Sequence, residues 1–240
     1  MSRNTWTPIA VSSSAALWSA DAWRLVESQH VASTMKIVDT PNEQDILESL
    51  LESSKPALPD DLARLHYLLA TPFRYWPGRG GSRFRGEFDP GVFYGAETIR
   101  TACAELGYWR WKFLQDADGL DHLDPVSHTG FKALFDTRVV DLRQPPFSAD
   151  AAAWMHPADY RATQRFAAIA REAGIGGIVY QSVRDPEPGW NVALLTPRAF
   201  AKPSPDRFMQ TWWLAVSKDG VVWRRDAERF TFSAEPWKAA

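Results

Sequence analysis

The chain of 240 residues is 45% hydrophobic, and its 27 Lys and Arg residues nearly balance its 29 Asp and Glu residues, for a net charge of −2. This composition predicts a folded protein with a substantial core, and it excludes the global basic field that would attract nucleic acid or anionic membranes. The single cysteine, Cys103, excludes an intrachain disulfide and fits a reducing cytoplasm.

The front of the chain combines an N-terminal stretch with two predicted helices. The N-terminal stretch is interrupted by serines, and no later stretch approaches the roughly 20 apolar residues of a membrane span, so we expect neither secretion nor membrane insertion. Thr40, Pro41 and Glu43 form a helix-start signature, with Thr40 as the N-cap and Glu43 closing a capping box. Leucines at helical spacing predict a second helix over residues 59–70. We therefore expect a helical N-terminal extension over residues 1–72, packed on the core.

A shaped loop, a strand and a third helix are predicted next. Residues 71–91 hold three prolines and five glycines, which predict a loop, and their aromatic side chains indicate that this loop is packed. The short apolar run VFYG predicts a buried strand, and residues 97–113 a helix. Within that helix, Glu105 lies about 240° around the axis from Ile99 and so points away from the apolar stripe. Its neighbours on the same face are Thr98, Thr101 and Tyr108.

The second half of the chain alternates strand and helix signals irregularly. The runs FKALFDTRVVDL, IVYQS and WNVALL predict strands, and a helix between them is entered by Pro157 and stopped by Gly174. Near the C-terminus, a Trp-rich hairpin is predicted to turn through Lys218, Asp219 and Gly220. Because the order lacks regular βαβ alternation, it favours an α+β fold with a mixed sheet.

Standard motifs for metal and nucleotide chemistry are missing from the sequence. The five histidines show no metal-ligand spacing, and one cysteine cannot build a zinc site. The patterns GxGxxG, GxxxxGK[ST] and GxSxG do not occur in a supporting context. We therefore predict no bound metal and no resident cofactor.

Four motifs in a fixed order resemble the RES domain family, named for an arginine, a glutamate and a serine. They read GSRFR, VFYGAE, TACAE and VYQSVRDPEPGWNVAL. The resemblance covers roughly residues 73–200 and places the three residues of the name at Arg83, Glu105 and Ser182, with Tyr94 as an aromatic at a strand end. Phe84 stands where a tryptophan or tyrosine often follows the arginine.

The resemblance implies a fold and a function. It implies an α+β core similar to ADP-ribosyltransferases, which we place over residues 73–240 behind the helical extension. It also implies an enzyme that consumes NAD as a substrate, typically the toxin of a toxin–antitoxin pair whose antitoxin is of the Xre type. Inorganic phosphate serves some members as a co-substrate.

The chemistry of these residues is compatible with cleavage of NAD. Breaking the nicotinamide–ribose bond creates positive charge on the sugar, which Glu105 can stabilise, while Arg83 offers a planar fork to phosphate oxygens. Tyr94 can stack on a ring and Ser182 can hydrogen-bond the sugar, so these four form the predicted catalytic set. The predicted substrate-binding residues are Arg74, Phe84, Arg85, Arg184 and Asn191.

Several alternatives stay open at the sequence level. Arg83 and Arg85 can instead pair with Glu87 and Asp89, and Glu105 can be a solvated helix residue. The acceptor of the sugar can be water, phosphate or a protein side chain, so a protein ADP-ribosyltransferase is one alternative. A non-catalytic interaction protein on the same scaffold is another. The oligomeric state is open as well, with a homo-oligomer among the options.

Overall fold

The computed structural model describes residues 6–28, 40–54, 56, 59–75 and 81–238. The strands are β1 (Ala16–Glu27), β2 (Phe93–Ala96), β3 (His122–Asp141), β4 (Gly177–Gln181), β5 (Trp190–Leu194), β6 (Gln210–Ser217), β7 (Gly220–Arg225) and β8 (Glu228–Ser233). The α-helices are α1 (Pro8–Ser13), α2 (Pro41–Ser54), α3 (Tyr67–Arg74), α4 (Ile99–Asp116), α5 (Ala151–Trp154), α6 (Arg161–Glu172) and α7 (Glu235–Lys238). Short 3-10 turns occupy Phe147–Asp150 and Pro197–Ala199.

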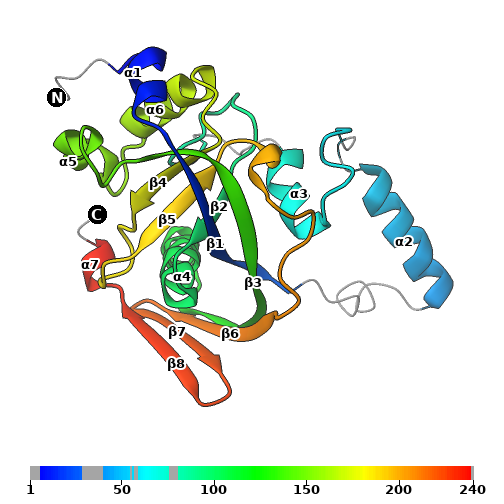
Figure 1. Ribbon diagram of the computed structural model, residues 1–240. Coiled ribbons are helices and arrows are strands. Elements are labelled where there is room, and N and C mark those ends of the chain that lie inside the picture. Colours follow the sequence, from blue (N-terminus) through cyan, green and yellow to red (C-terminus); the bar gives the residue numbers. More distant parts are fainter. Residues whose placement is uncertain (1–5, 29–39, 55, 57–58, 76–80, 239–240) are drawn as a thin grey trace.

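One mixed sheet of eight strands organises the molecule (Figure 1). The strand order is β1-β2-β5-β4-β3-β6-β7-β8, and β1 also pairs with β3, so the first five strands in this order close into a ring. The β3–β4 pair is parallel and the other pairs are antiparallel. This mixed sheet with helices packed around it confirms the α+β class.

The long strand β1 lies in the part of the chain where only helices were expected. All twelve of its residues, Ala16–Glu27, pair with residues 128–139 of β3. Most of these residues are exposed or half-buried, so the sequence of the strand lacks the apolar run that marks a buried strand. The N-terminal region therefore contributes to the central sheet as well as carrying helices.

The first predicted N-terminal helix is present, whereas the second shares only residues 67–70 with the range predicted for it. The capping box at the start of α2 is confirmed, since the Thr40 N–H donates to Glu43 Oε2 at 3.1 Å and the Glu43 N–H donates to Thr40 Oγ1 at 3.2 Å. Helix α3 begins later than predicted, because His66 is its N-cap and its Nδ1 accepts a hydrogen bond from the Leu68 N–H at 3.3 Å. Figure 1 shows α2 on the outer side of α3, and its apolar residues Ile46 and Leu50 are exposed.

Helix α4 lies between the five-stranded ring and the strands β6–β8 (Figure 1). Its backbone carbonyl at Cys103 accepts a hydrogen bond from the indole N–H of Trp223 on β7, at 3.0 Å. Gly107 allows the close approach, because a Cβ there would lie 2.8 Å from Cγ2 of Val221. The C-terminal hairpin thus fixes the position of α4 relative to the ring.

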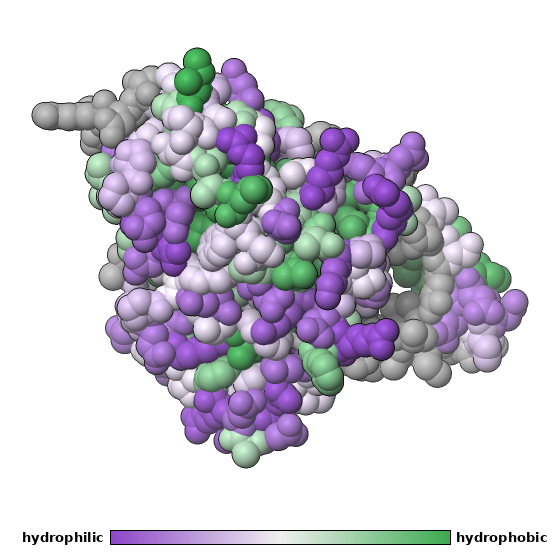
Figure 2. All heavy atoms as spheres, in the orientation of Figure 1, coloured by the Kyte–Doolittle hydropathy of each residue, from purple (hydrophilic) through white to green (hydrophobic). Residues whose placement is uncertain are grey.

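The predicted C-terminal hairpin is confirmed, with Ser217 opposite Gly220 across the turn between β6 and β7. On the face of the molecule shown in Figure 2, hydrophilic residues cover much of the surface and hydrophobic residues form small separate groups. Within the described residues, none of the helices combines the length and apolar character needed to cross a bilayer.

Candidate active site

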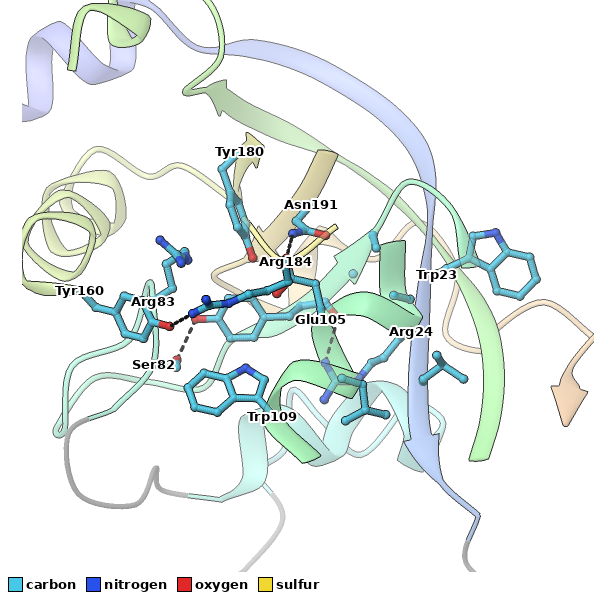
Figure 3. A pocket seen from close by; sticks show the side chains of 16 residues that line it. Trp23, Arg24, Ser82, Arg83, Glu105, Trp109, Tyr160, Tyr180, Arg184 and Asn191 are labelled. Atoms are coloured by element: carbon cyan, nitrogen blue, oxygen red, sulfur yellow. Dashed lines mark hydrogen bonds between the residues drawn. The ribbon is translucent and has the colours of Figure 1, made fainter. Parts of the chain in front are cut away.

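A row of paired residues across four strands forms the floor of the candidate active site. Tyr180 on β4 pairs with Asn191 on β5, Asn191 pairs with Ala96 on β2, and Ala96 pairs with Trp23 on β1. Residues directly opposite each other in a sheet project from the same face, so this register collects their side chains on one side. Helix α4 crosses this side and brings Glu105 over the row (Figure 3).

These elements enclose a cavity of about 250 Å³, which we call the main cavity. Its lining combines charged, polar and aromatic side chains from β1, β2, β4, β5, α4 and three loops. The lining residues are Trp23, Arg24, Leu25, Ser82, Arg83, Tyr94, Gly95, Ala96, Ala102, Glu105, Leu106, Trp109, Tyr160, Tyr180, Arg184 and Asn191. Four of the predicted residues, Arg83, Tyr94, Arg184 and Asn191, thus meet Glu105 in one site.

Two donors hold the carboxylate of Glu105 in place. Asn191 Nδ2 donates to Oε1 of Glu105 at 2.6 Å, and Ser182 Oγ donates to the same oxygen at 2.7 Å. The Ser182 hydroxyl in turn accepts hydrogen bonds from the N–H groups of Arg184 and Asp185, at 3.2 and 3.1 Å. Ser182 therefore lies behind the glutamate and orients it, and both of these hydrogen bonds end on Oε1, so that neither occupies the second carboxylate oxygen.

The loop that carries Ser182 packs on the face of α4 that the sequence marks as polar. Thr101 Oγ1 donates to Oδ2 of Asp185 at 3.0 Å, and Arg100 forms an ion pair with the other oxygen of the same carboxylate. Gly189 lies so close to α4 that a Cβ there would be 2.6 Å from Thr101 Oγ1. The face of Glu105 is thus covered by this loop, and the reading of Glu105 as a solvated helix residue is wrong.

Arg83 is buried and points toward backbone carbonyls instead of a carboxylate. Its Nη1 donates to the carbonyl oxygens of Trp154 and His156, at 2.9 and 3.0 Å, and its guanidinium lies 4.6 Å from the centre of the Tyr160 ring. Within the described part of the chain, no carboxylate forms an ion pair with Arg83, so its alternative assignment to a loop ion pair is wrong. Its positive charge therefore reaches the main cavity without a direct ion-pair partner among the described residues.

Arg184 is held by the same segment of chain. Its Nη2 donates to the carbonyl oxygen of Pro157 and, at 3.4 Å, to the hydroxyl of Tyr160, while its guanidinium lies 3.4 Å from the centre of the Tyr108 ring. Its Nη1 is buried and has no hydrogen-bond partner among the described residues. A buried N–H without a partner is costly, so this nitrogen is a candidate to bind a water molecule or a ligand acceptor.

Arg24 is a third guanidinium at the cavity, and the sequence pattern did not single it out. Its Nη1 donates to the carbonyl oxygen of Tyr94 at 2.8 Å, its charge lies 5.0 Å from the centre of the Phe93 ring, and its Nε is buried with no partner in the described chain. Burial lowers the pKa of Arg24 to about 10, so it stays protonated at neutral pH. Together the three arginines outweigh the single carboxylate of Glu105.

Tyr94 combines a place on the lining with a structural task. Its hydroxyl is 2.8 Å from Ser82 Oγ and accepts a hydrogen bond from the N–H of Phe84 at 3.0 Å. These bonds fix the loop that presents Arg83. Burial raises the pKa of Tyr94, and burial together with the nearby carboxylate of Glu105 raises the pKa of Tyr180 well above its ordinary value. Both phenols therefore remain neutral.

Three residues expected to bind substrate lie outside the lining. Phe84 is fully buried, with its ring 4.7 Å from that of Tyr180, because it belongs to the core beneath the site. Arg85 donates to the carbonyl oxygens of Asp89 and Tyr75, at 3.1 and 2.7 Å, and so braces its own loop. Nε of Arg74 donates to the carbonyl oxygen of Pro56 at 2.7 Å. Their closeness to Arg83 in sequence did not place them in the cavity, since successive side chains point in different directions.

Sequence reasoning missed the residues that reach the cavity from elsewhere. They include Trp23, Arg24, Trp109 and Tyr160. Arg24 lies on the strand β1, which was not predicted. Tyr160 lies just before α6, and the apolar pattern of that helix identifies only the residues on its buried face. The only sequence signal for Trp23 and Arg24 was their adjacency in the run AWRL, and two adjacent large side chains do not by themselves indicate a binding site. Where the chain is described, no group of three or more His, Cys, Asp or Glu residues could hold a metal ion.

The model of the RES domain family matches residues 58–217, which is more than half of the chain. Comparison with curated proteins gives no match. Among solved structures, the crystal structure of the M. tuberculosis MbcT–MbcA toxin–antitoxin complex is similar to 94% of this chain and 90% of that chain, with 12% sequence identity and a TM-score of 0.44.

Proposed function

The chain belongs to the RES domain family, and from this premise we propose that it cleaves the bond between nicotinamide and ribose in NAD. One observation carries the proposal. Inside an aromatic cavity, the carboxylate of Glu105 is oriented by two donors and surrounded by the guanidinium groups of Arg24, Arg83 and Arg184. This arrangement suits a ligand that is anionic along its backbone and develops positive charge at one carbon.

The reaction breaks the bond between the nicotinamide nitrogen and C1′ of the ribose. The electron pair of this bond leaves with the nitrogen, which neutralises the pyridinium and leaves an oxocarbenium-like sugar. Glu105 stabilises that developing charge, and its fixed orientation means that little reorganisation is needed at the moment of reaction. Ser182 and Asn191 act as positioning residues through Oε1 of Glu105.

The arginines supply binding of the pyrophosphate. Hydrogen bonds to charged groups are worth about 1.5–3 kcal/mol each, and the unpartnered N–H groups of Arg24 and Arg184 gain the most from a ligand oxygen. Aromatic faces at the cavity, including Trp109, which is half exposed at the rim, offer stacking surfaces to the nicotinamide ring.

To complete the reaction, an oxygen nucleophile must attack C1′ of the sugar and so accept the ADP-ribosyl group. Water adds its oxygen to C1′ and releases one proton, which gives ADP-ribose, whereas inorganic phosphate gives the corresponding 1-phosphate. The excess of positive charge at the cavity favours an anionic acceptor, so phosphate is the more suitable co-substrate on electrostatic grounds. A protein side chain as acceptor would make the enzyme a protein ADP-ribosyltransferase.

We further propose that the protein acts in the cell as the toxin of a toxin–antitoxin pair. An enzyme that consumes NAD without control would deplete its host, so the cavity requires an inhibitor. Its cationic lining fits an acidic segment or carboxyl terminus of a partner protein, and an antitoxin of the Xre type is the partner that the family membership supports.

The test is incubation of the purified protein with NAD, with and without inorganic phosphate, and separation of the products. The proposal expects nicotinamide release together with ADP-ribose or its phosphorylated form, and the sugar product identifies the acceptor. NAD that stays intact under both conditions would favour a non-catalytic interaction protein on this scaffold.

A further inference from the structure

A second cavity opens on the other side of Arg24, and its volume of about 410 Å³ exceeds that of the main cavity. Val26, Glu27 and Ser28 line it from β1 and the residue after it, Tyr67 and Thr71 line it from α3, and Arg24 lines both cavities. The run from Trp23 to Glu27 covers roughly 13 Å of strand. The two cavities are therefore lined by adjoining stretches of β1, and Arg24 is a lining residue of both.

The main cavity is too small for a whole dinucleotide. Sites that bury a drug-sized ligand have volumes of about 300–1,000 Å³, whereas the main cavity measures about 250 Å³. If the nicotinamide ribose lies at Glu105, the pyrophosphate reaches the arginines and the remaining half must leave the main cavity. Arg24 lines both cavities, so the second cavity is an adjoining space in which the remaining half can lie.

We propose that the second cavity binds the adenosine half of the substrate, an inference that rests on the proposed function. Tyr67 is 57% exposed at its edge and presents an aromatic face on which a purine base can stack. Glu27 accepts a hydrogen bond from Arg110 on one carboxylate oxygen, and its other oxygen can accept from a ribose hydroxyl. The hydroxyl of Ser28, paired with that of Thr129 at 3.0 Å, adds a polar wall.

The experiment compares NAD with nicotinamide mononucleotide, which carries the same reacting bond and one phosphate but no adenosine. The readout is the ratio of kcat/KM for NAD to kcat/KM for the mononucleotide. Stacking of one base is worth about 1–3 kcal/mol, so Tyr67→Ala should lower this ratio by about 5- to 150-fold. Thr71→Phe, which fills the second cavity from an exposed position, should lower it too.

Phe113→Ala is the matched control, since Phe113 is 56% exposed on α4 and lines neither cavity. It should keep the wild-type ratio. If NAD is cleaved but the ratio is the same in wild type, Tyr67→Ala and Thr71→Phe, the adenosine subsite is wrong and the proposed function stands.

A binding measurement separates the two ideas if neither substrate is cleaved. Titration calorimetry with AMP tests the second cavity without any chemistry. AMP binding that is weakened by Tyr67→Ala and kept by Phe113→Ala would support the subsite even if NAD cleavage fails. Wild-type protein that does not bind AMP would overturn it.

Discussion

At the scale of single residues, Arg83 and Ser182 have different roles: in the proposed function Arg83 binds the substrate, whereas Ser182 orients Glu105. Arg83 keeps two of its hydrogen bonds for the carbonyl oxygens of Trp154 and His156, so its charge is fixed in place before any ligand arrives. The hydroxyl of Ser182 donates to Glu105 and accepts hydrogen bonds from two backbone N–H groups. The sequence motifs singled out both residues but not these different contacts, because a contact between distant segments leaves no local pattern.

Replacing Arg83 should chiefly weaken substrate binding. In the proposed function Arg83 contacts phosphate in both the ground state and the transition state, so on that proposal Arg83→Ala should raise KM for NAD by about 10- to 150-fold. A smaller fall in kcat follows if the bound ribose is misplaced. Steady-state kinetics measure both constants, with circular dichroism as the folding check. Arg229→Ala, on the exposed strand β8, is the control for loss of one positive charge, and equal effects of the two substitutions would contradict the assignment.

Replacing Ser182 should lower stability as well as turnover. Ser182→Ala leaves the N–H groups of Arg184 and Asp185 without their acceptor and removes one donor from Glu105. An unsatisfied buried polar group costs about 1–3 kcal/mol, so the free energy of unfolding should fall by at least that range in urea denaturation. The exposed Ser53→Ala should change it by less than about 0.5 kcal/mol. A Ser182→Ala variant as stable as wild type would show that the hydroxyl does not support the loop.

At the scale of elements, the site is built where α4 crosses the register of four strands. Local signals predicted α4, the capping box of α2 and the C-terminal hairpin, because each of these has a cap, a period or a turn residue in its own sequence. They did not predict β1, whose residues are half exposed, or the start of α3 at His66, whose side chain forms an unusual N-cap. Arg24 was missed together with its strand.

Helix α4 should tolerate no added side chain where it meets the hairpin. Gly→Ala in a helix interior normally stabilises by about 1 kcal/mol, yet a Cβ at Gly107 would lie 2.8 Å from the buried Val221 and 3.2 Å from Nε1 of Trp223. Overpacking of this kind costs about 1–3 kcal/mol, so Gly107→Ala should lower the melting temperature. Because Glu105 is close along the helix, turnover should fall as well. A higher melting temperature would mean that α4 has room to shift.

At the scale of the whole molecule, folding brings together segments that are far apart in the sequence. Arg24, Arg83, Glu105 and Arg184 come from β1, a loop, α4 and a second loop, and the closed ring of strands fixes their relative positions. The order of motifs predicted that Arg83, Tyr94, Glu105 and Ser182 would converge, and they do so around one cavity. The sequence could not show that Phe84, Arg85 and Arg74 lie outside the cavity, since side-chain direction in a loop depends on packing.

Expression of the protein in cells should reveal the consequence of its activity. On the proposed function, induction of the wild-type chain should lower cellular NAD and arrest growth, because each turnover removes one molecule of NAD. Co-expression of the cognate antitoxin should restore growth by covering the cavity. Normal growth with unchanged NAD at high expression would contradict the toxin assignment, and a western blot would verify that the protein is present.

The central claim is that Glu105 stabilises the positive charge that forms as nicotinamide leaves. The most direct measurement is single-turnover release of nicotinamide from NAD by wild-type protein and by Glu105→Gln, which keeps the shape of the side chain. Loss of one preorganised electrostatic group typically costs about 10²–10³ in rate, so the variant should bind NAD with similar affinity and release nicotinamide at least 100-fold more slowly. Release at the wild-type rate by a folded Glu105→Gln variant would contradict the account.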